Sequence, residues 1–98
     1  MRLEWAIPAL DDLRHIANPS SPGEQSVGIR YARRVADAVT NLADHPGLGR
    51  LGRVNDTREL VVTGTPFLVM YSVGGDTVTV LRVLHHARRW PSTSDTEE

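Results

Sequence analysis

The first half of the chain carries two apolar stripes with the spacing of α-helices. The first stripe follows Pro8, a residue that the first helical turn tolerates, and it consists of Ala9, Leu13, Ile16 and Ala17. Asn18-Pro19 predicts its end. The second stripe consists of Ile29, Ala32, Val35, Ala36, Val39, Leu42 and Ala43. It predicts a second helix that begins after Ser21-Pro22-Gly23-Glu24, a capping-box pattern, and stops at His45-Pro46-Gly47.

Three β-rich runs follow, and a fourth short one precedes the first helix. Leu3 and Trp5 share one face of an extended segment over residues 2–6. The later runs are 58–62, 67–73 and 77–85, and they are separated by Gly64-Thr65-Pro66 and Gly74-Gly75-Asp76, which predict hairpin turns. Because the last run is apolar on both faces, we expect a central strand.

The order strand, helix, helix, three strands predicts an α+β fold in which two helices pack on one face of a mainly antiparallel sheet. Residues 1–91 are expected to form one domain, since 98 residues with 40% hydrophobic content suffice for one core. Residues 92–98 contain three carboxylates and no apolar residue, so we expect a solvated acidic tail.

The composition excludes several kinds of chemistry. There is no cysteine, which rules out a thiol nucleophile, a disulfide and a cysteine-ligated metal. The four histidines show no metal-ligand spacing, so neither metal nor cofactor is expected. The sequence has no secretory signal and no run of about 20 apolar residues, which predicts a cytoplasmic protein without membrane contact.

All eleven basic residues are arginines, and their distribution is uneven. Residues 1–49 hold five arginines and six carboxylates, residues 50–90 hold six and three, and residues 91–98 hold none and three, so the formal charges are −1, +3 and −3. Because guanidinium groups bind phosphate bidentately, the segment 50–90 is the one expected to meet a phosphate-bearing partner.

Two clusters of candidate site residues lie in that segment. The loop before the second strand carries Arg50, Arg53 and Arg58, a possible phosphate cradle. The alternative is a solubilising loop that pairs with Asp56 or Glu59. At the end of the last strand stand Arg82, His85, His86, Arg88 and Arg89, with Trp90 beside them.

Strand alternation places Arg82 and His86 on one face, and His85 with Leu81 and Val83 on the other. A strand-end histidine either transfers protons near neutrality or ties the following loop to the sheet. Trp90 either covers the sheet edge or offers a stacking surface to a base.

The chain resembles the RelE/ParE family of bacterial toxins, and the strand end is closer to the RelE/StbE branch. The resemblance rests on Trp5, Ala9, Asp12-Leu13, Leu42, His45-Pro46, Gly49-Arg50, Thr57-Arg58-Glu59-Leu60-Val61, Thr65-Pro66-Phe67, Tyr71 and Leu84-His85-His86-Ala87-Arg88-Arg89-Trp90-Pro91. It implies the toxic component of a type II toxin–antitoxin system, held inactive by a cognate antitoxin and reaching operator DNA only through that antitoxin.

Two activities share this fold, so the fold does not choose between them. The resemblance favours a metal-independent, ribosome-dependent mRNA endonuclease. Its catalytic candidates are Arg58, His85, His86 and Arg88, and its substrate-binding candidates are Arg50, Arg53, Arg82, Arg89 and Trp90. The alternatives are a non-nuclease toxin that poisons DNA gyrase and a degenerate module that only binds the antitoxin. Arginine where well-known RelE members carry lysine, and the lack of a tyrosine after Arg88, depart from the nuclease pattern.

Overall fold

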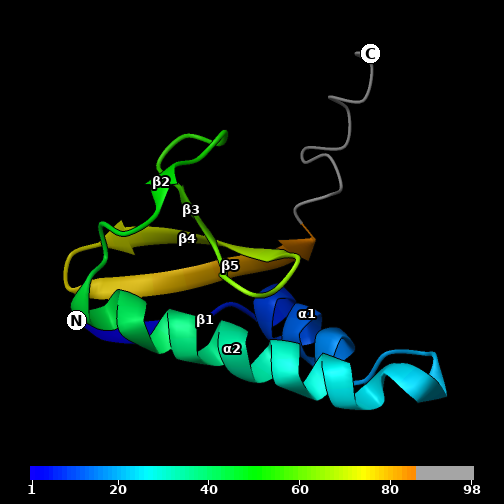
Figure 1. Ribbon diagram of the computed structural model, residues 1–98. Helices are drawn as coiled ribbons and strands as arrows, with labels where there is room; N and C mark the ends of the chain where they lie inside the picture. Colours follow the sequence, from blue (N-terminus) through cyan, green and yellow to red (C-terminus); the bar gives the residue numbers. More distant parts are fainter. Residues whose placement is uncertain (86–98) are drawn as a thin grey trace.

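The computed structural model describes residues 1–85, apart from the side chain of Pro22. It shows a five-stranded sheet with two α-helices on one face (Figure 1). The strands are β1 (Arg2–Trp5), β2 (Arg50–Leu51), β3 (Arg58–Val61), β4 (Phe67–Gly74) and β5 (Thr77–His85), and the helices are α1 (Ile7–Ala17) and α2 (Gln25–Asp44), the latter preceded by the 3₁₀ turn η1 (Pro22–Glu24). The predicted α+β class is confirmed. Residues 86–98, with the end of the predicted domain and the whole predicted tail, lie outside the described residues.

The strands are arranged in the order β1-β5-β4-β3-β2. Only β1 runs parallel to its neighbour β5, and the other three pairings are antiparallel. β5 has a neighbour on each side, as predicted from its apolar faces. β2 was expected to be part of a loop. Two residues carry no readable periodicity, and its two pairings, Arg50 with Glu59 and Leu51 with Arg58, make it a strand.

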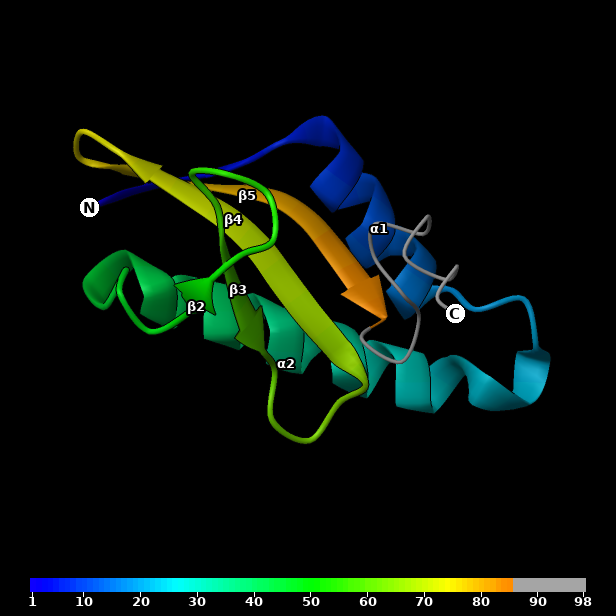
Figure 2. The same cartoon turned by 90° about the horizontal axis from the view of Figure 1, so that it is seen from above.

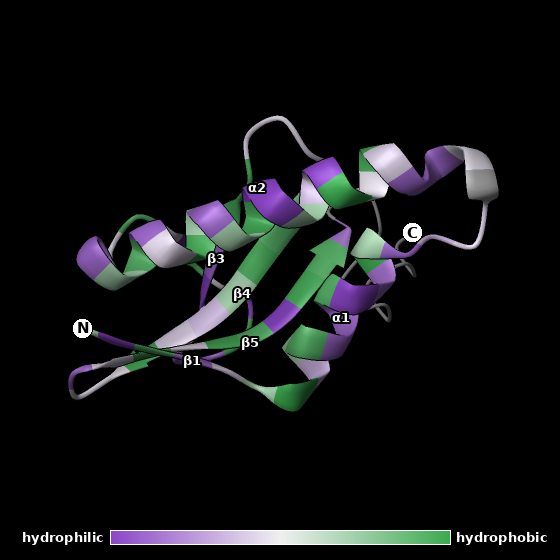
Figure 3. Ribbon diagram, turned by 90° about the horizontal axis from the view of Figure 1, so that it is seen from below, coloured by the Kyte–Doolittle hydropathy of each residue, from purple (hydrophilic) through white to green (hydrophobic). Residues whose placement is uncertain are grey.

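The hydrophobic core lies between the helices and the sheet. α2 contributes Val35, Val39 and Leu42, all fully buried, and α1 contributes Ala9. The sheet contributes Val69, Tyr71, Val78, Val80 and Val83. Figure 3 shows apolar and polar residues alternating along α2, which lies across the sheet. Burying a valine or leucine of this kind contributes about 1.5–3 kcal/mol, so this layer holds the domain together.

The beginning of α2 differs from the prediction in two ways. Ile29 was placed on the apolar stripe, yet its side chain is 51% exposed, because the buried face passes through Gly28 instead. The first turns of α2 extend past the sheet (Figure 2). The predicted capping box is wrong: Ser21 makes no side-chain capping bond, and the 3₁₀ turn η1 leads into α2.

β5 contains a bulge that changes which side chains share a face. Met70 of β4 pairs with Arg82, but Tyr71 pairs with Val80, so Leu81 has no partner. Val80 and Val83 are therefore both buried beneath the helices. His85 shares the face of Val83 as predicted, whereas the prediction that Leu81 belongs to the same alternation is wrong.

Candidate functional site

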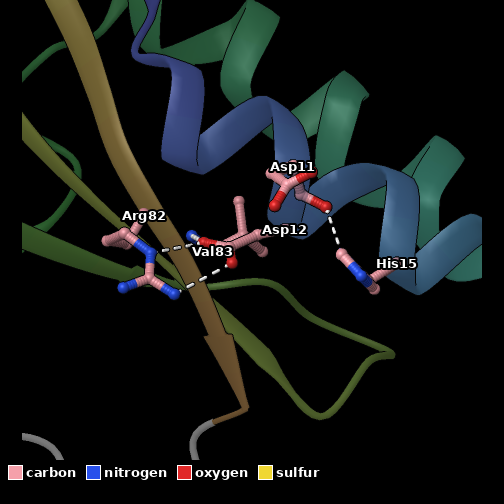
Figure 4. Close-up of polar contacts among 5 residues, drawn as sticks. All are labelled: Asp11, Asp12, His15, Arg82 and Val83. Atoms are coloured by element: carbon pink, nitrogen blue, oxygen red, sulfur yellow. Dashed lines mark hydrogen bonds and ion pairs between the residues drawn. The ribbon is translucent and has the colours of Figure 1, made fainter.

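Beyond the end of β1, the edge of β5 is hydrogen-bonded to the side chain of Asp12 in α1. β1 ends at Trp5, and the amide of Ala6 makes the last bond on that side, to the Val80 carbonyl at 2.8 Å. Beyond it, the backbone N–H of Val83 donates to Asp12 Oδ2 at 2.9 Å (Figure 4). A carboxylate thus replaces the missing strand, and it fixes the chain just before His85.

Asp12 also binds Arg82 through both carboxylate oxygens. Arg82 Nε donates to Oδ2 at 2.7 Å, and an Nη donates to Oδ1 at 2.9 Å (Figure 4). The hydrogen bond to Asp12 raises the pKa of Arg82, burial opposes this, and the charge of Asp12 adds to it. The guanidinium that was predicted to bind substrate therefore has a partner within the chain, and its substrate role stays a prediction.

Arg58 holds the segment that leaves α2. It is the cross-strand neighbour of Tyr71, so it lies on the helix-covered face of the sheet. One Nη donates to the Gly49 carbonyl at 2.7 Å. The buried Tyr71 hydroxyl donates to the Pro46 carbonyl at 2.7 Å and accepts from the Gly49 amide at 2.8 Å. Together they bind the stretch from Pro46 to Gly49 to the sheet.

Arg50 and Arg53 lie around a buried carboxylate on the opposite face. Glu59 is only 4% exposed, and its Oε1 lies 3.7 Å from an Nη of the exposed Arg50. Its Oε2 accepts from the Arg53 backbone amide at 3.4 Å. The Gly52 amide donates to the Thr57 carbonyl, and that of Gly49 to Tyr71. Both glycine amides are therefore engaged within the chain and are not available to a phosphate in this loop.

The face of the sheet away from the helices has charged ends and an apolar middle. Arg50, Glu59, Met70 and Arg82 are successive cross-strand neighbours from β2 to β5. Met70 and Leu68 of β4 are 7% and 6% exposed. The hairpin between β2 and β3 stands above this face (Figure 1). The apolar side chains in the middle of this face are therefore buried, and the arginines at its sides are the exposed groups.

His85 lies at the far end of the helix-covered face. Its ring contacts Phe67 edge-on, with centroids 5.4 Å apart, and Phe67 in turn meets Tyr31 of α2 at 5.9 Å. These rings line a groove of about 850 Å³ between α1, α2 and the β4–β5 end, whose rim includes Asp11, His15 and Glu24. His85 is thus packed against aromatic neighbours as a wall of this groove.

The predicted catalytic residues are not gathered at one place within residues 1–85. Arg58 pairs with Tyr71 and His85 with Phe67, on opposite sides of β4 and four residues apart along it. Strand geometry separates their Cα atoms by roughly 16 Å. His86, Arg88, Arg89 and Trp90 lie outside the described residues.

Three residues that organise this region were given no role from the sequence. Asp12 and Tyr71 belong to the residues that carry the family resemblance, which was the available signal. Glu59 was considered only as an ion-pair partner for the loop arginines. The bonds of Asp12 and Tyr71 join positions 22 to 71 residues apart, as in Tyr71 with Gly49 and Asp12 with Val83. No local pattern contains such pairings.

Two negative findings apply to the described part of the chain. Within residues 1–85, no group of three or more His, Asp or Glu side chains is placed to hold a metal ion. None of the helices in the same range has the length and apolar character needed to cross a membrane.

A family model described as the ParE toxin of the type II toxin–antitoxin system parDE matches residues 3–90. A Sinorhizobium fredii protein named as toxin Y4kP is 34% identical over 90 residues, which is 92% of this chain and 93% of that protein. This chain belongs to the ParE toxin family of type II toxin–antitoxin systems. The predicted membership in the RelE/ParE group is therefore confirmed.

Other members of the group carry either name. Toxin RelE2 of Caulobacter vibrioides is 34% identical over 84 residues, covering 86% of this chain and 93% of that protein. The fold matches a chain of the chromosomal ParDE system from Pseudomonas aeruginosa with a TM-score of 0.69 at 22% identity, covering 87% and 95% of the two chains. It matches the intact RelBE complex of Escherichia coli with a TM-score of 0.58 at 14% identity, covering 84% and 92%. A ParE family toxin thus has relatives under both names.

Proposed function

We propose that this ParE family toxin acts by binding a protein target, DNA gyrase, and does not cut mRNA. The sequence alone favoured the nuclease. The observation that supports the gyrase proposal is the separation of the catalytic candidates, since Arg58 and His85 lie on opposite sides of β4 and four residues apart along it. A ribonuclease must bring its phosphate ligand and its proton-transfer groups within hydrogen-bond reach of one phosphate.

The engagement of the arginines gives further support. Arg58 binds the Gly49 carbonyl, and Arg82 binds both oxygens of Asp12. Moving either guanidinium to a phosphate would break contacts that fasten the chain to the sheet.

The test is a supercoiling assay with purified gyrase and relaxed plasmid, with toxin added in increasing amounts. We expect loss of supercoiling or accumulation of cleaved plasmid, and relief by the cognate antitoxin. In a parallel experiment, cells in which the toxin is induced should show no new codon-phased mRNA ends by primer extension. Full gyrase activity at every toxin concentration, together with new mRNA ends, would overturn the proposal.

The second candidate is the mRNA endonuclease, and the exposed loop arginines favour it. Arg50 and Arg53 stand on the hairpin above the open face, where they are placed to meet a polyanion. Arg58→Ala and Arg88→Ala should then abolish the new mRNA ends at equal protein abundance. Because Arg58 also holds Gly49, the thermal stability of that variant must be measured alongside. Toxicity unchanged in both variants would exclude this site.

A further inference from the structure

A second groove, of about 530 Å³, runs between α2 and the outer edge of the sheet. Its floor and lower wall come from the end of β3 and the segment after it, Val61 to Thr63, and from Leu48. Its upper wall is a row of polar side chains on α2: Arg30, Arg33, Arg34, Asp37 and Asn41. Leu48 and Val61 are 52% and 45% exposed, although both line this hollow.

The backbone along this groove is an unpaired β edge. β2 covers only Arg58 and Glu59 of β3, so nothing in residues 1–85 pairs with the strand beyond Glu59 on that side. The Val62 amide donates inward, to the Phe67 carbonyl at 2.9 Å. In an antiparallel ladder the flanking residues point the other way, so the amide and carbonyl of Val61 face the groove. Such an edge accepts a further strand.

The groove is cationic. Three arginines and one aspartate line it, a formal charge of +2. Arg30 and Arg33 make no ion pair or hydrogen bond within residues 1–85, and Arg34 reaches only the Thr63 carbonyl, at 3.4 Å. Arg30 and Arg33 therefore stand along the edge with unused hydrogen-bond donors, and Arg34 uses one of its donors.

We propose that this groove binds an extended segment of the cognate antitoxin that alternates apolar and acidic side chains. The segment pairs with the backbone of Val61, sets its apolar side chains against Leu48 and Val61, and directs its carboxylates to Arg30, Arg33 and Arg34. The inference rests on the proposed antitoxin partnership but not on the choice between gyrase and mRNA.

Two other occupants fit less well. A second copy of this chain would bring an equally cationic groove, so two such edges repel each other. The chain's own residues 92–98 are acidic but contain no apolar side chain, so they cannot cover Leu48 and Val61. Only a segment with both acidic and apolar side chains can pair with the arginines and also cover Leu48 and Val61.

The first experiment compares two doubly charge-reversed toxins. Arg30→Glu with Arg33→Glu alters the groove, and Arg2→Glu with Arg14→Glu makes the same change in net charge at exposed sites elsewhere. The probe is the purified product of the reading frame adjacent to the toxin gene. At about 0.1 M salt we expect the Kd of the groove variant to rise at least about tenfold, and that of the control variant by less than about twofold. Equal Kd values for the two variants would overturn the proposal.

The second experiment measures hydrogen exchange of individual amides in the wild-type toxin. The Val61 amide should exchange quickly in the toxin alone and become protected in the complex. Protection in the toxin alone that disappears when residues 92–98 are removed would show that the tail occupies the edge. Protection that depends on toxin concentration would indicate a second copy. Either result, or an unprotected Val61 in the complex, would refute the assignment.

A growth assay separates this inference from the proposed function. Expressed alone, the groove variant should arrest growth like the wild type, and the antitoxin should no longer rescue the cells. Rescue as complete as for the wild type refutes the groove. Failure of the gyrase assay leaves this comparison intact, because the escape from antitoxin is scored on growth, whatever the cellular target.

Discussion

Replacing Asp12 by alanine should destabilise the protein by about 2–3 kcal/mol, because one carboxylate accepts three hydrogen bonds at the β5 edge. The larger part comes from Val83. Val83 is only 4% exposed, so in the variant its backbone N–H is buried without an acceptor, which costs about 1–3 kcal/mol. Arg82 is 39% exposed and regains water, so its share is below about 1 kcal/mol.

Urea unfolding followed by circular dichroism measures this directly, and in a thermal scan the same loss lowers Tm by roughly 10–20 °C for a domain of this size. Asp11→Ala is the matched control. Asp11 is the neighbouring residue, and its carboxylate makes only an exposed contact with Arg14 at 3.3 Å. It should cost less than about 0.5 kcal/mol. If the two variants unfold at the same urea concentration, the hydrogen bonds of Asp12 at the β5 edge contribute nothing to the free energy of unfolding.

The pH dependence of this difference follows from the raised pKa of Arg82. A group whose pKa is higher in the folded state stabilises it fully below the unfolded-state pKa, and this contribution fades only as the pH rises through the folded-state value. Both values lie far above neutrality. Titration of Arg82 should therefore leave the gap between wild type and Asp12→Ala constant from about pH 7 to about pH 9, and a gap that closes in this window contradicts the assignment.

Two further substitutions probe packing. Tyr71→Phe removes the hydroxyl that binds the Pro46 carbonyl and the Gly49 amide, and leaves both groups unpaired. The free energy of unfolding in urea should fall by about 1–3 kcal/mol. A fall below about 0.5 kcal/mol would mean that water replaces the hydroxyl. Gly28→Ala would raise the free energy of unfolding by about 1 kcal/mol in an ordinary helix. Here a Cβ collides with the Ile16 carbonyl and with Pro19 Cδ at 2.8 Å, so we expect this free energy to fall by about 1–3 kcal/mol. The control is the exposed Ser26→Ala in the same helix, which should be neutral or stabilising.

Most of the fold could be predicted because its signals are local. The stripe from Val35 to Leu42 and the continuous β-rich run of β4 each extend over many residues, so a misplaced end does not hide the element. The failures have local causes too. The two residues of β2 give no period, and the Leu81 bulge shifts the alternation by one residue without leaving a glycine or proline to mark it. Ile29 lies on the predicted apolar side of α2, yet it is 51% exposed because the buried face passes through Gly28.

The candidate site was harder to predict, since residue type does not tell what a side chain binds. Arg58 looks the same in the sequence whether its guanidinium binds a phosphate or the Gly49 carbonyl. Only the position of the stretch from Pro46 to Gly49 in the fold decides which group it binds. Arg82 and Asp12 are 70 residues apart in sequence, so their pairing appears only when α1 packs beside β5.

Charge counted along the sequence and charge presented at the surface differ in this protein for the same reason. The segment 50–90 has a formal charge of +3, yet Arg50, Arg58 and Arg82 each have a partner within residues 1–85, and of its described arginines Arg53 alone has an unpartnered side chain. The segment 1–49 has a formal charge of −1, yet Arg30 and Arg33 stand unpaired on one face of α2. Available guanidinium groups for an anionic partner therefore lie on α2, beside the open β3 edge, in a segment whose net charge is negative.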